Sequence, residues 1–223
     1  MIVGVIGYDS IRKHLAACGY YTAEIREKYY LRIADAYIDI KEQRGQYWLE
    51  NIMKDRFAVS MFGQKRLSRE GGIEIVVKEL CTRMARDGCQ VTCYNRSGHH
   101  VSGAEYDNKI EYDGIRQKFV PTIERKGLAA VSSSFFAALY SAFGKYDVVH
   151  IHAEGPAFFS WLPKMFRKRV VVTIHGIDWQ REKWKSEFGS KFIRQGEKNA
   201  VKYADEIIVL SKGVQDYFKD TYG

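Results

Sequence analysis

Residues 147–174 read DVVHIHAEGPAFFSWLPKMFRKRVVVTI, and this stretch decides the fold. It contains two nearly continuous apolar runs, at 148–152 and 170–174. Runs of this kind are typical of strands that are buried on both faces of a parallel sheet. The segment between them predicts a helix over 156–166, and strand–helix–strand is the unit from which parallel sheets are built.

The same alternation continues on both sides of this stretch. Apolar residues recur every three or four positions between 72 and 86, which predicts a helix with one apolar stripe. Further helices are predicted at 128–143, at 182–203 and from about 211 to the end, and further strands at 57–62, 90–94, 116–120 and 207–210. We therefore expect an α/β fold, a Rossmann-like doubly wound parallel sheet over residues 57–223.

The first 56 residues have a different character. A short apolar start at 1–7 precedes a charged, tyrosine-rich stretch at 22–53, in which Tyr29, Ile33, Tyr37 and Ile40 recur at loose helical spacing. We predict a helical N-terminal extension over 1–56, to which the sequence assigns no role. The domain boundary is expected near 54–56.

Composition indicates a folded protein. Apolar residues make up 46% of the chain and charged residues 28%, unlike the profile of disordered chains. No apolar run reaches the roughly 20 residues that span a bilayer, and no secretory signal is evident, so a cytoplasmic protein is expected. The four cysteines form no CxxC pair. Buried free thiols are therefore favoured over a disulfide or zinc framework.

The net charge of +8 favours an anionic partner. Nucleic acid is disfavoured because the charge is moderate and no nucleic-acid recognition motif is present. An anionic membrane surface remains a candidate, because basic residues alternate with aromatic ones after residue 163; a solvated helix face is the alternative. The residues concerned are Lys164, Arg167, Lys168, Arg169, Trp179, Arg181, Lys183, Trp184, Lys185, Phe188, Lys191 and Phe192.

Ligands of doubly wound sheets bind beyond the carboxyl ends of the strands, so the loops that follow strands are the candidate sites. The first is 63–72, GQKRLSREGG, where Gly71 and Gly72 open a helix whose N-terminus could approach a phosphate. Arg66 and Arg69 add positive charge. A flexible turn is the alternative, and the loop matches neither GxGxxG nor the GxxxxGK[ST] motif.

Two further loops carry histidines. His150 and His152 lie two residues apart on one strand and so share a face, and Glu154 follows. His175 leaves the next strand, where an imidazole could donate a hydrogen bond, accept a proton or hold a hydroxyl. The two strand exits are expected to converge on one cleft. Asp178 caps the next helix or binds a substrate hydroxyl, and a metal site would need a third ligand from His99, His100 or His175.

The ordered motifs resemble the N-terminal domain of GT-B glycosyltransferases, particularly retaining family four and its rhamnosyltransferase-like bacterial members. The matching text is SREGGIEIVVKELCTRMARDG, VTCYNR, DVVHIHAEGPA, VVVTIHGIDWQREKW and ADEIIVLSKGVQDYF. The resemblance covers residues 57–223. It implies transfer of a sugar from a nucleotide-sugar donor to a saccharide or lipid-linked saccharide acceptor in polysaccharide or glycolipid biosynthesis.

The resemblance also implies roles for single residues. His175 would be the catalytic histidine near the reacting sugar, and Gly71 and Gly72 would approach the donor diphosphate. The acceptor cleft would involve His152, Glu154, Asp178 and Arg69. No cofactor and no divalent metal are expected.

The family's C-terminal donor-binding domain would lie beyond Gly223, so this chain is expected to be inactive alone and to need a donor-domain polypeptide. It would work in the cytoplasm or at the inner face of the membrane. The alternative from another class is a non-catalytic Rossmann-like module that binds a partner protein or an anionic membrane surface.

Overall fold

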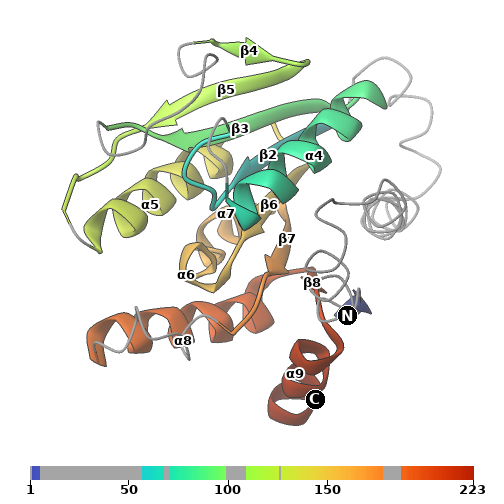
Figure 1. Cartoon of the computed structure of the whole chain (residues 1–223), viewed down its shortest axis with the longest axis vertical. Helices are drawn as coiled ribbons and strands as arrows, with labels where there is room; N and C mark the ends of the chain where they lie inside the picture. Colours follow the sequence, from blue (N-terminus) through green and yellow to red (C-terminus); the bar gives the residue numbers. More distant parts are fainter. Residues whose placement is uncertain (1, 6–56, 68–70, 99–108, 126, 178–186) are drawn as a thin grey trace, which may run out of the picture.

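A computed structural model describes residues 2–5, 57–67, 71–98, 109–125, 127–177 and 187–223. In this part of the chain, eight strands form one sheet in the order β1-β8-β7-β6-β2-β3-β5-β4 (Figure 1). All neighbouring strands are parallel except β4 and β5. The strands are β1 (Ile2–Val5), β2 (Ala58–Phe62), β3 (Gln90–Arg96), β4 (Glu111–Tyr112), β5 (Ile115–Val120), β6 (Val148–His152), β7 (Arg169–Ile174) and β8 (Glu206–Val209).

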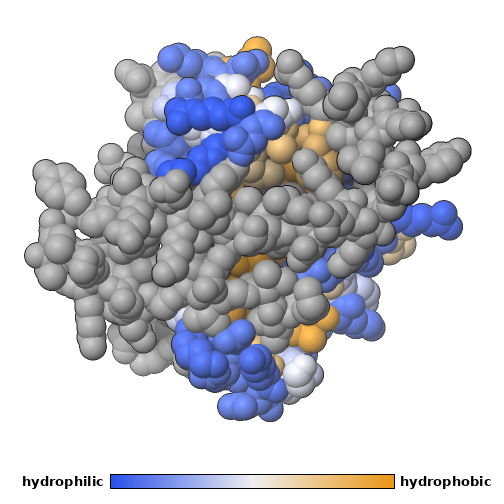
Figure 2. All heavy atoms as spheres, turned by 90° about the vertical axis from the view of Figure 1, so that its right-hand side faces the viewer, coloured by the Kyte–Doolittle hydropathy of each residue, from blue (hydrophilic) through white to orange (hydrophobic). Residues whose placement is uncertain are grey.

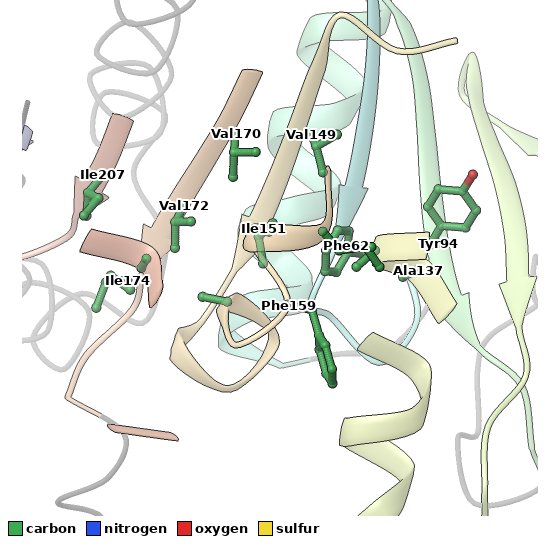
Figure 3. Close-up of a cluster of buried hydrophobic side chains, with 14 of the residues drawn as sticks. Phe62, Tyr94, Ala137, Val149, Ile151, Phe159, Val170, Val172, Ile174 and Ile207 are labelled. Carbon is green, nitrogen blue, oxygen red and sulfur yellow. The ribbon is translucent and has the colours of Figure 1, made fainter. Parts of the chain in front are cut away.

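Helices cover both faces of this sheet, which confirms the predicted α/β Rossmann-like fold. On one face, α4 packs an apolar stripe that includes Val77 and Leu80 against β2 and β3. On the other face, helices α5 to α9 enclose a second core around Ile151 and Val172 (Figure 3). The helices are α4 (Gly72–Arg86), α5 (Leu128–Phe143), α6 (Glu154–Ala157), α7 (Trp161–Met165), α8 (Glu187–Tyr203) and α9 (Lys212–Tyr222).

The strand order places a topological switch point between β2 and β6. From β2 the chain passes through α4 to β3 on one side, whereas from β6 it passes to β7 on the other side. Two neighbouring parallel strands whose connections diverge leave a crevice beyond their carboxyl ends. The loops that follow β2 and β6 are therefore the place to look for a site.

Two aspartates stabilise the opposite, amino edge of the sheet. The Asp147 carboxylate accepts a hydrogen bond from the backbone N–H of Ala58 (2.9 Å), at the start of β2. In the same way, the Asp205 carboxylate accepts from the N–H of Val170 (2.8 Å) and forms an ion pair with Lys164 (2.6 Å). Each aspartate precedes one strand and binds the start of its neighbour, so both fix strand register at this edge.

Two features differ from the sequence-based expectation. The helix predicted over 156–166 is divided into α6 and α7, because Pro163 has no N–H to continue a helix and is tolerated only in a first turn. A hairpin of β4 and β5 was not predicted, although its Asp113–Gly114 turn is a strong hairpin signal. Both turn residues have positive φ, at 52° and 78°.

Some expectations fall outside the described residues. These are the helical stretch at 22–53 and the beginning of the helix predicted over 182–203.

The strand β1 pairs with β8 and was not predicted. No helix in the described ranges is both long enough and apolar enough to cross a bilayer.

The cysteines in the described ranges are free thiols. Cys81 and Cys93 are buried, with their sulfur atoms 3.3 Å apart, and Cys89 is half-buried. Burial raises the pKa of the Cys81 thiol, because the thiolate would be desolvated. This confirms the expectation of free thiols for these three residues.

Candidate functional site

At the switch point β2 and β6 end side by side, and the region beyond their carboxyl ends, where ligands of such sheets bind, is called the crevice below. Gly63 follows β2 with a φ of 117°, a conformation that favours glycine. A Cβ atom at this position would overlap the backbone carbonyl oxygen of His152, the last residue of β6. Only a glycine therefore lets the β2 exit pass this close to the β6 exit.

Three histidines form a connected group beside this crevice. The rings of His150 and His152 stack with their centroids 4.3 Å apart, and both side chains are completely buried. His150 Nε2 lies 2.7 Å from the hydroxyl of Thr173 on β7. His152 Nδ1 lies 3.1 Å from Nε2 of His175, which is half-buried at the end of β7. The predicted convergence of these two strand exits is confirmed.

The contacts of His152 determine where the protons lie. Its Nε2 faces the sulfur of Met61 at 3.1 Å, and a thioether can only accept a hydrogen bond. His152 therefore carries its proton on Nε2, so Nδ1 is the acceptor and His175 donates from its Nε2. A neutral His175 then has Nδ1 as its acceptor nitrogen. Met61 thus sets the tautomer of His175 through His152.

Burial keeps the two inner histidines neutral. It lowers the pKa of His150 to about 3, with a smaller contribution from the charge of His175. Burial also lowers the pKa of His152 well below its usual value, and the neighbouring histidines add to this effect. At neutral pH both therefore act as uncharged hydrogen-bonding groups behind His175.

The described ranges contain no group of side chains arranged to bind a metal ion. No three His, Cys, Asp or Glu side chains are grouped there so as to hold one. Within the histidine group, the facing nitrogens of His152 and His175 are bonded to each other. The expectation that no metal or cofactor is needed stays a prediction.

The turn after β6 has an unusual backbone. Ala153 has φ 75° and ψ 156°, a region that residues other than glycine rarely adopt, and its N–H donates to the carbonyl of Thr173 (2.9 Å). Such conformations cluster at functional sites, where the surrounding structure maintains them. The next residue, Glu154, begins α6 and is completely buried. Its carboxylate is therefore not exposed to solvent.

The position of α6 depends on close packing against α8. A Cβ atom at Gly196, in the middle of α8, would overlap the carbonyl oxygen of Glu154 and lie 3.1 Å from the N–H nitrogen of Phe158. Both neighbours are backbone atoms, which cannot rotate away. The absence of a side chain at Gly196 thus sets the distance between α8 and the turn at Ala153.

Gly196→Ala is therefore expected to lower the free energy of unfolding by about 1–3 kcal/mol, as overpacked core substitutions do, despite the better helix propensity of alanine. Chemical denaturation of the purified variant measures this change. Gly213→Ala in α9 is the matched control, because nothing lies within 4 Å of a Cβ there. The control should be neutral or stabilising by up to about 1 kcal/mol; equal effects of the two substitutions would contradict the packing argument.

The N-terminus of α4 follows the loop from β2. Gly71 precedes the helix in an extended conformation, and Gly72 is its first residue. The Glu74 carboxylate accepts a hydrogen bond from the N–H of Lys65 (3.0 Å) and lies next to Gly71. This first turn therefore already carries one negative charge. Binding of a donor diphosphate at Gly71 and Gly72 stays a prediction.

A buried polar network holds the β2 loop in place, and sequence reasoning missed it. Asn95 accepts from the N–H of Leu67 (3.1 Å) and donates to the side-chain oxygen of Gln117 (2.8 Å). Arg66 donates from Nε to the carbonyl of Arg96 (3.1 Å). Amides within the strands β3 and β5 were the available signal. Their partners lie some thirty residues away, so spacing alone does not reveal them.

The other predicted site residues are distributed as follows. His152 and His175 meet, and Glu154, two residues after His152, is completely buried. Arg69 and Asp178 lie outside the described residues, as do His99 and His100.

Three described members of the predicted basic and aromatic surface do not lie together, and the membrane-surface role stays a prediction. Lys164 and Lys168 precede β7 at the amino edge, where Lys164 pairs with Asp205 and Lys168 donates to the carbonyls of Gly144 and Tyr146. Phe192 follows β7 and stacks on Phe158, with the ring centroids 4.4 Å apart. These residues therefore lie at opposite edges of the sheet. Residues 178–186 lie outside the described part of the chain.

Comparison with known sequences identifies the family. The profile of Glycosyltransferase Family 4 matches residues 70–223, which is more than half of the chain. The chain belongs to glycosyltransferase family 4. The match includes α4, the histidine group and every element that follows it. No curated protein matches the family 4 chain.

Solved structures support the same fold. Sucrose-phosphate synthase from Thermosynechococcus elongatus is 18% identical with a TM-score of 0.58, and the match covers 74% of the family 4 chain and 45% of the synthase. Anabaena HepE, solved in complex with UDP and glucose, is 16% identical with a TM-score of 0.51. This match covers 76% of the family 4 chain and 42% of HepE. The family 4 chain thus spans less than half the length of either protein.

Proposed function

We propose that the family 4 chain forms the acceptor-side domain of a glycosyltransferase, which moves a sugar from a nucleotide-sugar donor to a saccharide or lipid-linked saccharide. The observation that carries this proposal is the pair of His175 and His152 at the switch point. His175 is half-buried at the crevice, whereas the neutral His152 behind it is completely buried. This arrangement suits a group that contacts a sugar hydroxyl with a fixed tautomer.

In this proposal, each predicted residue has a distinct task. His175 contacts the reacting sugar, and His152 positions it from behind. Gly71 and Gly72 admit the donor diphosphate to the N-terminus of α4. Arg69 and Asp178 bind acceptor hydroxyls, and the buried Glu154 reaches the acceptor only after the turn at Ala153 moves.

The wider reaction follows from the same proposal. A second domain stabilises the charge of the departing diphosphate, so the 223-residue chain alone is inactive. No divalent metal takes part. The reaction is retaining and rhamnosyltransferase-like, and it serves polysaccharide or glycolipid synthesis in the cytoplasm or at the inner face of the membrane. HepE with its UDP and glucose supports a nucleotide-sugar substrate.

The test is an activity assay on the whole gene product purified from its own cell. Release of a nucleoside diphosphate is measured with a panel of nucleotide sugars, saccharides and lipid extracts. We expect turnover of one nucleotide sugar, and we expect His175→Ala to lower kcat by about 10²–10⁴-fold, the contribution typical of a positioned acid–base group. Lys212→Ala, an exposed residue of α9, is the control and should leave kcat unchanged.

Two results would contradict the proposal. An unchanged rate in His175→Ala would remove this histidine from the reaction. Turnover by the isolated 223-residue chain at an ordinary enzymatic rate would remove the need for a second domain. If the whole gene product turns over no nucleotide sugar, a non-catalytic module that binds a partner protein or an anionic membrane becomes the better hypothesis.

A further inference from the structure

The helix α5 is packed with its small residues inward and its large apolar residues outward. The side toward the sheet is formed by serines and alanines, among them Ser134, Ala138 and Ala142. The exposed or half-exposed residues are Leu128, Phe135, Phe136, Leu139, Tyr140 and Phe143. The helix contains no charged residue. A surface helix normally carries charged or polar residues on its outer face, so this face is suited to an apolar environment.

The end of α7 extends this apolar surface. The rings of Phe143 and Phe166 lie 4.5 Å apart, and Met165 is beside Phe166 in the chain. Phe143 is 67% exposed, Met165 69% and Phe166 42%. Lys168 ties the two segments together by donating to the carbonyl of Gly144 (2.7 Å). The surface formed by Leu128, Phe135, Tyr140, Phe143, Met165 and Phe166 is called the α5–α7 face below.

The charges nearest the Phe143 end of the α5–α7 face are of one sign, and the exposed Glu124 lies near the other end, four residues before Leu128. The sequence has no Asp or Glu between residues 125 and 146, or between 155 and 177. Lys145 and Arg167 are exposed next to Phe143 and Phe166. The adjacent carboxylate of Asp147 is bonded to the N–H of Ala58. The face is therefore apolar and aromatic at its centre and cationic at its rim.

The apolar centre and the cationic rim together indicate which kind of partner can cover the α5–α7 face. A two-fold contact between copies of the chain would place the cationic rim against itself, with no carboxylate from these segments to pair with it. An anionic membrane fits both the apolar centre and the cationic rim of the face. Aromatic side chains lie at the level of the headgroups, and lysine and arginine bind anionic lipids. Figure 2 shows the side of the molecule that lies on the right in Figure 1, where the described residues include hydrophilic ones at the top and bottom and apolar ones between them.

We propose that the α5–α7 face is a membrane-docking surface, which lies in the headgroup region of an anionic bilayer with Phe143, Met165 and Phe166 inserted. This role is independent of sugar transfer. It shares Arg167 and Lys168 with the surface predicted after residue 163, but its apolar centre lies on α5 and the end of α7. It lies on the face of the sheet opposite α4.

The test is co-sedimentation of the 223-residue chain with vesicles of phosphatidylcholine alone or mixed with an equal amount of phosphatidylglycerol. Binding is expected only to the mixed vesicles and should weaken as salt is raised. Phe143→Ser combined with Met165→Ser should lower the partition coefficient at least about tenfold, because each removes an inserted apolar side chain. Lys145→Glu combined with Arg167→Glu should lower it by a similar factor.

Ile75→Ser is the matched control, because Ile75 is an exposed apolar residue of α4 on the other face of the sheet. This variant should bind vesicles as the unchanged chain does. Thermal unfolding checks that the variants remain folded. Equal binding to both kinds of vesicle, or unchanged binding by both double variants, would overturn the proposal. A dimer would overturn it as well. If sedimentation velocity detects a dimer, and Phe143→Ser combined with Met165→Ser abolishes that dimer, the face is a contact between copies of the chain. Vesicle binding needs no nucleotide sugar, so this proposal and the proposed function fail separately.

Discussion

Lowering the pH from 7 to 5 is expected to reduce the free energy of unfolding by about 2 kcal/mol through His150, and His152 adds to this loss in the same direction. Both histidines are neutral and buried in the folded protein, with pKa values held below the usual value near 6.5. The unfolded chain therefore binds protons that the folded protein does not. The stabilisation is fully present above pH 6.5 and is lost as the pH falls toward 3.

The measurement is urea denaturation of the chain at several pH values. His150→Asn is the comparison, because it removes one titrating group and should reduce the pH dependence between 7 and 5 by about 2 kcal/mol. Carboxylates contribute equally to both proteins and cancel in the difference. If the variant and the unchanged chain lose stability with the same slope, His150 is not buried in its neutral form.

Gly63→Ala is expected to destabilise the fold by more than about 3 kcal/mol. Two effects add: the φ of 117° is unfavourable for alanine, and the new methyl group would overlap the carbonyl oxygen of His152. Because His152 bonds to His175, the substitution should also disturb the site. Urea denaturation measures the first effect, and the imidazole NMR signals of His175 report the second.

Gly88→Ala separates the two effects. Gly88 follows α4 with a φ of 87°, but nothing lies within 4 Å of a Cβ there. This variant should lose only about 1–2 kcal/mol, the usual penalty for a left-handed backbone, and should leave the His175 signals in place. Equal losses in the two variants would show that the contact between the β2 and β6 exits is not tight.

Much of the fold could be predicted because the signals were local. The helices at 72–86 and 128–143 and the strand at 148–152 match the structure residue for residue. The periodic spacing or the apolar run that predicts each element lies within the element itself. The division between α6 and α7 was missed because the whole stretch is apolar, and the proline that prevents one continuous helix was not taken into account.

The site could be predicted only in part. The convergence of His152 and His175 followed from the strand exits alone. The partner that sets the tautomer, Met61, lies 91 residues before His152 and carries no sequence signal beyond a strand position. Likewise, the close approach of α6 to α8 depends on Gly196, which is distant in sequence from the Glu154 carbonyl that it faces.

The aspartates at the amino edge have a consequence for engineering. Asp147 and Asp205 fix the starts of four strands, β2, β6, β7 and β8, without using any residue of the crevice. The groups that fix the sheet at its amino edge are thus separated from the carboxyl edge, where the site is proposed. Substitutions at exposed positions of that edge should therefore leave both anchors intact, whereas the loop after β2 contributes the buried Leu67 to the core and has to be kept.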